Sequence, residues 1–264
     1  MVKDRGAFEH ATPVLYDRYM GPLLFEPWAN LVAQRAAVLQ PGRILETAAG
    51  TGIVTRSLSR AVPDAEIVAT DLNPAVLAFA EQSEWPERVR FQAADAQDLP
   101  FADDCFDLVV CQFGVMFMPD KPRANREARR VLNAAGRYLF LTFDRLSLNP
   151  LSEAAGKAVD ELFPDDPLRY MERGPYSYTD PAQIEQDLRA ADFTTIDIET
   201  LTLSSRVTAR DAAQGLVLGG PLRGEIEQRD PAALEPALEA VTLALESWDG
   251  KDAPMSVHVV TAAP

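Results

Sequence analysis

The stretch RILETAAGTGIVTRSL, residues Arg43 to Leu58, decides the fold class of this chain. Strand-like residues lead into Glu46, a turn of small residues with Gly50 and Gly52 follows, and a helical pattern begins at once. A buried strand that only has to turn needs no such run of small residues. Glycines at the start of a helix, by contrast, let backbone N–H groups approach a ligand closely. The stretch therefore predicts a strand–turn–helix unit with room for a ligand above the turn.

Short apolar runs alternate with helical patterns from residue 43 to residue 143. This alternation is typical of a parallel sheet covered by helices. The strands are expected at residues 43–48, 66–71, 89–95, 106–113 and 136–143. Asn73 and Pro74 predict the start of a helix, as its N-cap and its first residue. The pattern indicates a doubly wound α/β domain.

The composition narrows the partners and the location. The net charge is −15 and no basic stripe is present, which argues against a nucleic-acid partner. Cys105 and Cys111 cannot build a disulfide framework, and no zinc-binding spacing occurs, so no metal is expected. The chain has no signal-peptide pattern and no run of eighteen apolar residues. We therefore expect a cytoplasmic protein without a membrane partner.

Polar or small residues follow successive strands of the expected sheet. In a doubly wound sheet, ligands bind outside the carboxyl ends of the strands. Those ends carry Glu46 with its glycines, then Asp71, then Asp95, and finally the segment CQFGVMFMPD. A glycine-rich turn is often a packing feature and a single Asp is often a helix cap. Their order on successive strands is more specific, and it favours a nucleotide-like ligand.

The glycine pattern separates the classes of nucleotide-binding protein. The dinucleotide fingerprint G-x-G-x-x-G fails, because Gly50-x-Gly52 is followed by Thr55 at the third position. A P-loop is excluded, because no Gly-Lys-Ser/Thr follows. The segment ETAAGTG resembles the acidic-x-Gly-x-Gly-x-Gly loop of class I S-adenosylmethionine-dependent methyltransferases, with Ala48 in place of the first glycine. The resemblance covers residues 43–143 and extends to the group that includes quinone-biosynthesis C-methyltransferases.

The resemblance implies S-adenosylmethionine as the cofactor, S-adenosylhomocysteine as the product, and a role for ten residues. These are Glu46 near the amino group of the cofactor, Ala48, Gly50 and Gly52 at its methionine part, Asp71 at the ribose hydroxyls, Leu72 on the adenine, Asp95 and Ala96 at the adenine edge, and Gln112 and Phe113 at the methyl-transfer chamber.

The resemblance also implies a fold and a division of the chain. The expected fold is a Rossmann-like, mostly parallel, seven-stranded sheet with an antiparallel last strand. Four segments are expected: a helical cap (1–40), the cofactor-binding core (41–145), a helical insert over the acceptor pocket (146–193), and the last two strands with a helical lid between them (194–264). The glycine-rich break at 215–225 is either a hinge for that lid or an ordinary break between helices.

Methyl transfer from a sulfonium is an in-line displacement that requires neither a metal nor a covalent nucleophile. Positioning supplies most of the acceleration, and a general base is needed only where the acceptor loses a proton. The catalytic residue is therefore unknown, and the weak candidates are His10, Tyr16 and Tyr19. A solvated surface imidazole is the favoured interpretation of His10, and packing of the tyrosines against the sheet is at least as good an interpretation as a role in catalysis. Apolar residues after the fourth strand favour a small apolar or aromatic acceptor.

Other functions remain open beside this one. A non-catalytic S-adenosylmethionine-binding protein has the same cofactor motif. A nicotinamide-dependent oxidoreductase is disfavoured, because no tyrosine is followed by lysine four residues later. Base methylation in nucleic acids is disfavoured, because CQFGVMF replaces the Asn/Asp-Pro-Pro-aromatic motif. The acceptor, the methylated atom, the pathway and the oligomeric state, a homodimer included, are left open by the sequence.

Overall fold

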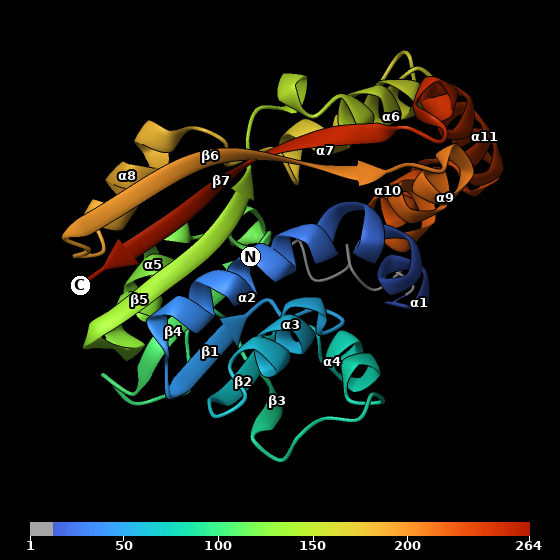
Figure 1. Cartoon of the computed structure of the whole chain (residues 1–264). Helices are drawn as coiled ribbons and strands as arrows, with labels where there is room; N and C mark the ends of the chain where they lie inside the picture. Colours follow the sequence, from blue (N-terminus) through green and yellow to red (C-terminus); the bar gives the residue numbers. More distant parts are fainter. Residues whose placement is uncertain (1–12) are drawn as a thin grey trace. The chain divides into compact units, whose positions relative to one another are not determined.

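The computed structural model describes residues 13–264 and contains a seven-stranded sheet in the order β3-β2-β1-β4-β5-β7-β6 (Figure 1). The strands are β1 Arg43–Thr47, β2 Glu66–Asp71, β3 Val89–Ala93, β4 Phe106–Gln112, β5 Leu132–Phe143, β6 Thr195–Arg206 and β7 Asp252–Ala263. Strands β1 to β5 pair in parallel, and β7 pairs with β5 antiparallel. The predicted fold class is confirmed.

Strand β1 lies at the point where the strand order reverses. Its neighbours are β2 on one side and β4 on the other, and the chain reaches β4 only after it has built β2 and β3. In such sheets the ligand crevice opens at the carboxyl ends of the strands beside this point. Ile44 and Leu45 of β1 and Val109 and Val110 of β4 are fully buried, as strands covered on both faces require.

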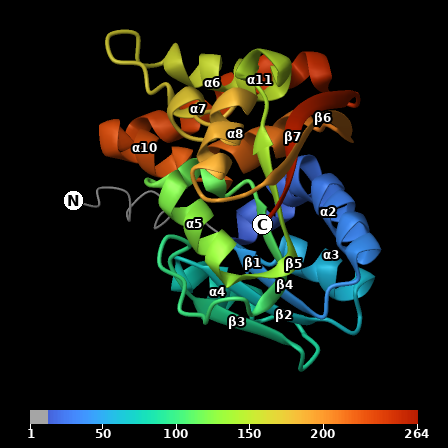
Figure 2. The same ribbon diagram turned by 90° about the vertical axis from the view of Figure 1, so that its left-hand side faces the viewer.

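Helices cover both faces of this part of the sheet. Figure 2 shows α2 and α3 on one face and α5 on the other. The helices concerned are α2 Glu26–Leu39, α3 Ile53–Ala61, α4 Pro74–Ala80, η2 Val115–Phe117, α5 Lys121–Val131 and α8 Pro181–Arg189. The predicted cap of α4 is confirmed, because Oδ1 of Asn73 accepts a hydrogen bond from Ala75 N at 2.9 Å and Pro74 is the first helical residue.

Strand β5 starts earlier than the sequence predicted. The structure ends α5 at Val131 and starts β5 at Leu132, with a shift of register between Phe106 and Leu108 on the paired strand. The sequence predicts a strand start at Gly136, because a glycine after a helical pattern indicates a helix end. Here the irregular pairing accommodates the extra residues within the strand.

The contacts between residues group the chain into two compact units. Unit 1 contains the residues up to Pro27 together with 146–174 and 202–256, and unit 2 contains 28–145, 175–201 and 257–264. The boundary divides β6 and β7. The expected helical cap and the expected insert are likewise each divided between the two units.

Unit 1 is mainly helical. Its helices are α1 Pro13–Leu15, η1 Tyr16–Phe25, η3 Leu146–Leu148, α6 Pro150–Asp160, α7 Tyr170–Arg173, α9 Ala209–Ala213, η4 Gln214–Gly219, α10 Leu222–Arg229, η5 Pro231–Ala233, α11 Leu234–Leu245 and η6 Glu246–Trp248. Helix α11 packs against α6 and α9. The helices η1 and η4 are π-helices, a rare form that the 3.6-residue periodicity of the sequence does not indicate.

Two glycines let η1 and η4 approach each other closely. A Cβ atom on Gly219 would lie 3.2 Å from the Tyr16 backbone, and one on Gly215 would lie 3.1 Å from Tyr19 Cβ. Both glycines therefore have a packing role inside unit 1. Among the residues that the structure describes, every helix is too short or too polar to cross a bilayer.

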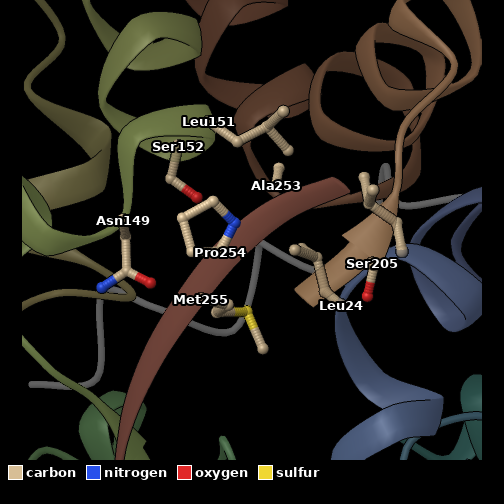
Figure 3. Close-up of a pocket in the computed structure, with 9 residues that line it drawn as sticks. Leu24, Asn149, Leu151, Ser152, Ser205, Ala253, Pro254 and Met255 are labelled. Carbon is tan, nitrogen blue, oxygen red and sulfur yellow. The ribbon is translucent and has the colours of Figure 1, made fainter. Parts of the chain in front are cut away.

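Unit 1 also holds a cavity of about 10 Å³ (Figure 3). Beside it, Asn149 and Ser256 exchange hydrogen bonds: Ser256 N donates to Asn149 Oδ1 at 3.0 Å, and Asn149 Nδ2 donates to Ser256 O at 3.2 Å. Leu151 and Met255 supply apolar walls. A cavity of this volume holds at most a water molecule, so it is too small to be an acceptor site.

Candidate functional site

The carboxyl end of β1 carries a buried acid. Glu46 is 2% exposed, and its Oε2 accepts a hydrogen bond from the Thr55 hydroxyl at 2.6 Å. The pKa of Glu46 is raised to about 8, chiefly by burial and also by the nearby charge of Asp71, against the lowering effect of the Thr55 bond. Glu46 is therefore neutral between about pH 4.5 and pH 8, where an ordinary glutamate is charged.

The turn after β1 adopts a backbone that favours glycine. Ala48 and Gly50 have φ of +56° and Gly52 has φ of +82°, all in the left-handed region. Ala49 N donates to Thr70 O at 2.9 Å, and Gly52 N donates to Ala49 O at 3.0 Å, so the turn is fixed to β2 and closed on itself. Ala48 carries the strain that a glycine at this position would avoid.

The space around the two glycines of the turn differs. A Cβ atom on Gly50 would meet nothing within 4 Å, so the space above it is open. A Cβ atom on Gly52 would lie 3.2 Å from the Trp85 ring, so that space is filled by the protein itself. Of these two glycines, only Gly50 has beside it the open space that the sequence predicts over the whole turn.

Asp71, at the end of β2, binds the same turn. Its Oδ2 accepts a hydrogen bond from Gly50 N at 2.9 Å, and its Oδ1 accepts one from Asn73 N at 2.9 Å. Burial raises the pKa of Asp71, although both backbone donors act in the opposite direction. Next to it, the Leu72 side chain is 54% exposed, which leaves an apolar surface available to a flat ring.

The turn after β3 contains the next pair of predicted residues. Asp95 Oδ1 accepts hydrogen bonds from Gln97 N at 2.8 Å and from Gln97 Nε2 at 3.1 Å. Ala96 lies between these two residues and is half-buried. The turn is therefore ordered by its own side chains and presents a carboxylate and a backbone amide next to each other in sequence.

The end of β4 packs against the turn after β1. A Cβ atom on Gly114 would lie only 2.4 Å from Ala48 Cβ, so the two backbones are in close contact. Phe113 is 7% exposed, with φ of +54°, and its ring stacks on Phe143 at 4.4 Å between centroids. Gln112, which precedes it, is half-buried. Most of the Phe113 ring is thus covered by the protein's own aromatic side chains.

Two of the weak candidates for catalysis belong to a different unit from these residues. Tyr16 and Tyr19 belong to η1 of unit 1, whereas all ten predicted cofactor-binding residues belong to unit 2. The Tyr16 ring stacks on Phe25 at 5.0 Å, and Arg18 lies over the Tyr19 ring at 5.1 Å. His10 lies outside the described residues.

Two further side chains of chemically reactive types, His258 and Cys111, are buried in unit 2. His258 forms hydrogen bonds through Nδ1 with Thr200 Oγ1 at 2.9 Å and through Nε2 with Thr179 O at 3.0 Å. Cys111 is fully buried, and burial raises the pKa of its thiol to about 11. Both groups therefore have the surroundings of structural residues.

Three neighbours of the site were missed by the sequence analysis. Thr55 bonds Glu46, Trp85 fills the space beside Gly52, and Gly114 allows β4 to approach the turn. Only Gly114 had a usable signal, because a glycine directly after a buried strand indicates a close backbone approach. The other two contacts join residues that only the folded chain brings together.

Comparison with known proteins finds a family model and several relatives that are similar to the central segment. A family model described as a methyltransferase domain matches residues 45–140. The malonyl-[acyl-carrier protein] O-methyltransferase of Halorhodospira halophila is 33% identical over 171 residues, which is 58% of this chain and 58% of that protein. The ubiquinone/menaquinone biosynthesis C-methyltransferase of Pseudomonas aeruginosa is 37% identical over 132 residues, 48% of this chain and 52% of that protein. The chain thus spans little more than half the length of these curated relatives.

Solved structures share the fold. The YcgJ protein of Bacillus subtilis superposes with a TM-score of 0.60 at 18% identity, over 89% of this chain and 97% of that one. The Haemonchus contortus phosphoethanolamine N-methyltransferase 2, solved with phosphomonomethylethanolamine and S-adenosylhomocysteine, superposes with a TM-score of 0.63 at 18% identity, over 100% of this chain and 61% of that one. At such identities the likeness shows the fold alone.

Proposed function

We propose that this chain, whose residues 45–140 belong to the methyltransferase-domain family, is an S-adenosylmethionine-dependent methyltransferase that acts on a small-molecule acceptor. The relatives described above are named as an O-methyltransferase and a C-methyltransferase, which supports the reaction class and leaves the methylated atom open. The apolar residues after β4 support an acceptor that is apolar or aromatic. A cytoplasmic location stays a prediction from the sequence.

One observation carries this proposal: the space above Gly50 is open, and the backbone amide of the same residue is bonded to Asp71. A ligand in that space would contact the turn after β1 and the acid at the end of β2 together. This combination fits a molecule that has a ribose next to a polar tail. It gives a structural reason for the left-handed, side-chain-free backbone at Gly50.

The remaining residues extend the site along the strand ends. We assign the ribose hydroxyls to Asp71, one face of the adenine to Leu72, and the adenine edge to the carboxylate of Asp95 and the amide of Ala96. The turn with Ala48, Gly50 and Gly52 lies at the methionine part, and Gln112 and Phe113 lie towards the methyl group. Leu72 supports this assignment directly, because an exposed leucine beside a binding acid offers apolar area to a ring.

Glu46 responds to the charge of the bound molecule. It holds its proton up to about pH 8 in this structure, because burial disfavours the carboxylate. A cationic amino group nearby favours the ionised form, so binding would be accompanied by release of this proton. Thr55 keeps the acid oriented through its 2.6 Å hydrogen bond.

When bound, the cofactor supplies a methyl group on a sulfonium, and the neutral thioether that remains after transfer is a good leaving group. The protein then has to position the two reactants, a contribution of roughly 7–11 kcal/mol in well-oriented cases. The stacked rings of Phe113 and Phe143 form a rigid wall that can exclude water on the β4 side of this site. Proton removal is left to the acceptor's own acidity or to a residue not yet assigned.

Calorimetry on the whole chain with S-adenosylmethionine, S-adenosylhomocysteine and NADH tests the proposal. We expect both sulfur compounds to bind and NADH not to bind. A methyl-transfer assay over phenols, quinones and amines then seeks the acceptor. Binding of NADH without binding of either sulfur compound would overturn the assignment. Binding without turnover on any acceptor class would favour the non-catalytic alternative.

A further inference from the structure

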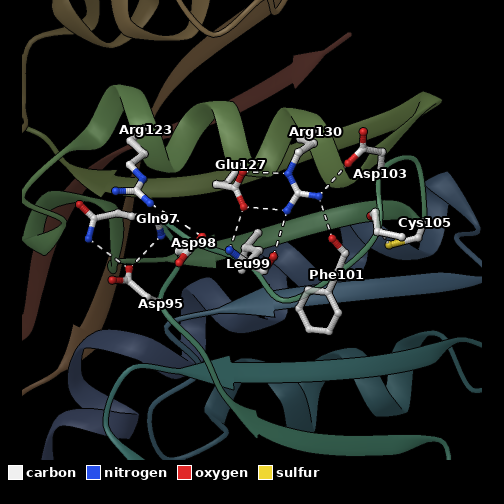
Figure 4. Close-up of polar contacts among 11 residues, drawn as sticks. Asp95, Gln97, Asp98, Leu99, Phe101, Asp103, Cys105, Arg123, Glu127 and Arg130 are labelled. Carbon is white, nitrogen blue, oxygen red and sulfur yellow. Dashed lines mark hydrogen bonds and ion pairs between the residues drawn. The ribbon is translucent and has the colours of Figure 1, made fainter.

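Side chains of helix α5 hold the turn after β3 in place through hydrogen bonds to the backbone of that turn (Figure 4). Leu99 N donates to Glu127 Oε2 at 2.8 Å, and Leu99 O accepts from Arg130 Nη2 at 2.9 Å. One acid and one base of α5 therefore bind both backbone polar groups of a single loop residue. Bonds to a charged partner at both groups fix a loop more firmly than neutral bonds of the same number.

Glu127 and Arg130 are themselves joined in a two-point ion pair. Arg130 Nε donates to Glu127 Oε1 at 2.8 Å, and Arg130 Nη2 donates to Glu127 Oε2 at 2.7 Å. Arg130 Nη1 also donates to Phe101 O at 2.7 Å and to Asp103 Oδ1 at 2.8 Å. The hydrogen bonds from Arg130 lower the pKa of Glu127, so its carboxylate stays charged at neutral pH. Lysine cannot reproduce this arrangement, because it lacks the planar fork of donors.

The same helix also fixes the other end of the turn. Gln97 Oε1 accepts a hydrogen bond from the backbone N of Asp120, the residue that caps α5. Gln97 in turn donates to Asp95 Oδ1, and Asp98 N donates to Asp95 O at 2.9 Å. Asp95 is thus oriented by neighbours whose positions depend on α5 at both ends of the segment 95–99.

We propose that Glu127 and Arg130 are positioning residues for adenine recognition: they hold the turn 95–99 so that the Asp95 carboxylate and the Ala96 amide meet the adenine edge. This inference rests on the proposed function. Neither residue has to touch the cofactor, because each acts through Leu99 and the turn that precedes it. The alternative is an ion pair that stabilises the fold and has no effect on ligand selectivity.

A base-selectivity measurement separates the two readings. S-inosylhomocysteine has hypoxanthine in place of adenine, so it lacks the amino group that Asp95 would accept from, and its ring N1 is a donor. We expect the native chain to bind S-adenosylhomocysteine at least about tenfold more tightly than the inosine compound. In Glu127→Ala and Arg130→Lys we expect the affinity for S-adenosylhomocysteine to fall about tenfold, with the affinity for S-inosylhomocysteine within about threefold of native.

Arg126→Gln is the matched control. Arg126 is exposed on the same helix, and none of the hydrogen bonds described above involves it. Both affinities should stay at the native values. Glu127→Gln serves if Glu127→Ala does not fold, because glutamine keeps an acceptor for Leu99 N and loses the charge. Thermal melting of each variant verifies that the compared proteins are folded.

A double variant tests whether Glu127 acts through Asp95. If it does, Glu127→Ala added to Asp95→Ala causes no further loss of affinity for S-adenosylhomocysteine. Equal losses for both ligands, or an additive double variant, would overturn the positioning role and leave the proposed function intact. Failure of the native chain to bind either S-adenosylmethionine or S-adenosylhomocysteine would instead overturn the proposed function, and this inference with it.

Discussion

The Asp71 carboxylate accepts a hydrogen bond from the backbone N–H of Gly50, with 2.9 Å between Oδ2 and N. The two residues are 21 positions apart in the chain: Asp71 ends β2, and Gly50 lies in the turn after the neighbouring parallel strand β1. The acid that we assign to the ribose therefore also holds the glycine turn in its conformation. A change at Asp71 should affect both the stability of the turn and the affinity of the site.

Asp71→Ala removes the acceptor from two backbone donors, Gly50 N and Asn73 N. We expect the free energy of unfolding to fall by about 1–3 kcal/mol and the affinity for S-adenosylhomocysteine to fall at least tenfold, roughly the worth of a charged hydrogen bond. Urea unfolding and calorimetry measure the two effects. Asp64→Ala, at an exposed turn, is the control and should change neither. An unchanged affinity in Asp71→Ala would remove Asp71 from the site.

Gly50→Ala and Gly52→Ala distinguish a glycine that leaves space for a ligand from a glycine that is needed for packing. Both glycines have positive φ, so each alanine should cost about 1 kcal/mol of unfolding free energy from backbone strain. Alanine at Gly52 also meets Trp85, which should make that variant the less stable of the pair. The methyl group at Gly50 points into open space, so we expect it to weaken S-adenosylhomocysteine binding at little further cost in stability. Native-like binding by Gly50→Ala would contradict a ligand above this residue.

Gly114→Ala should be rescued by a change at Ala48, in the turn after β1. Its Cβ would lie 2.4 Å from Ala48 Cβ, an overpacked contact that we expect to cost about 1–3 kcal/mol. Ala48→Gly removes the opposing methyl group and relieves the positive φ of Ala48. The double variant should regain most of the lost stability in urea unfolding, a clear departure from additivity. An additive result would mean that the contact with Cys111 Sγ, at 2.9 Å, is the one that matters.

Glu46 should make stability depend on pH. Its pKa is about 8 in the folded chain against an ordinary 4.5, so the folded state holds more protons than the unfolded state between these values. The free energy of unfolding should therefore fall as pH rises through this window. Glu46→Gln removes this titrating group. Between pH 5 and pH 7.5, the free energy of unfolding of the variant should therefore rise by roughly 1–3 kcal/mol relative to that of the native chain. If the free energies of unfolding of the two proteins differ by the same amount at pH 5 and at pH 7.5, the raised pKa is ruled out.

The parts of the fold that sequence predicted well are those set by local patterns. The apolar runs around Ile44 and Val109 had to form strands covered on both faces, and Asn73 with Pro74 had to start a helix. The start of β5 was misplaced, because Gly136 carries the local signal of a helix end and the true boundary depends on pairing with β4.

The arrangement of the candidate site residues along the strand ends followed from the sequence to a similar extent. The order of Glu46, Asp71 and Asp95 on successive strand ends was visible in the chain, because the carboxyl ends of parallel strands share one edge. That Trp85 fills the space beside Gly52, or that Thr55 bonds Glu46, follows from packing between helices and strands. The glycine contacts between the π-helices η1 and η4 join segments far apart in the sequence, which no single-helix pattern encodes.

Each unit is assembled from separate stretches, so the backbone passes from one unit to the other five times, after residues 27, 145, 174, 201 and 256. A single protease cut cannot release either unit, and neither can be expressed alone from one continuous gene fragment. Transplanting the helical unit from another protein of this fold would need three coordinated grafts. The helical unit is therefore easier to alter by point substitutions in its three stretches than by exchange as a module.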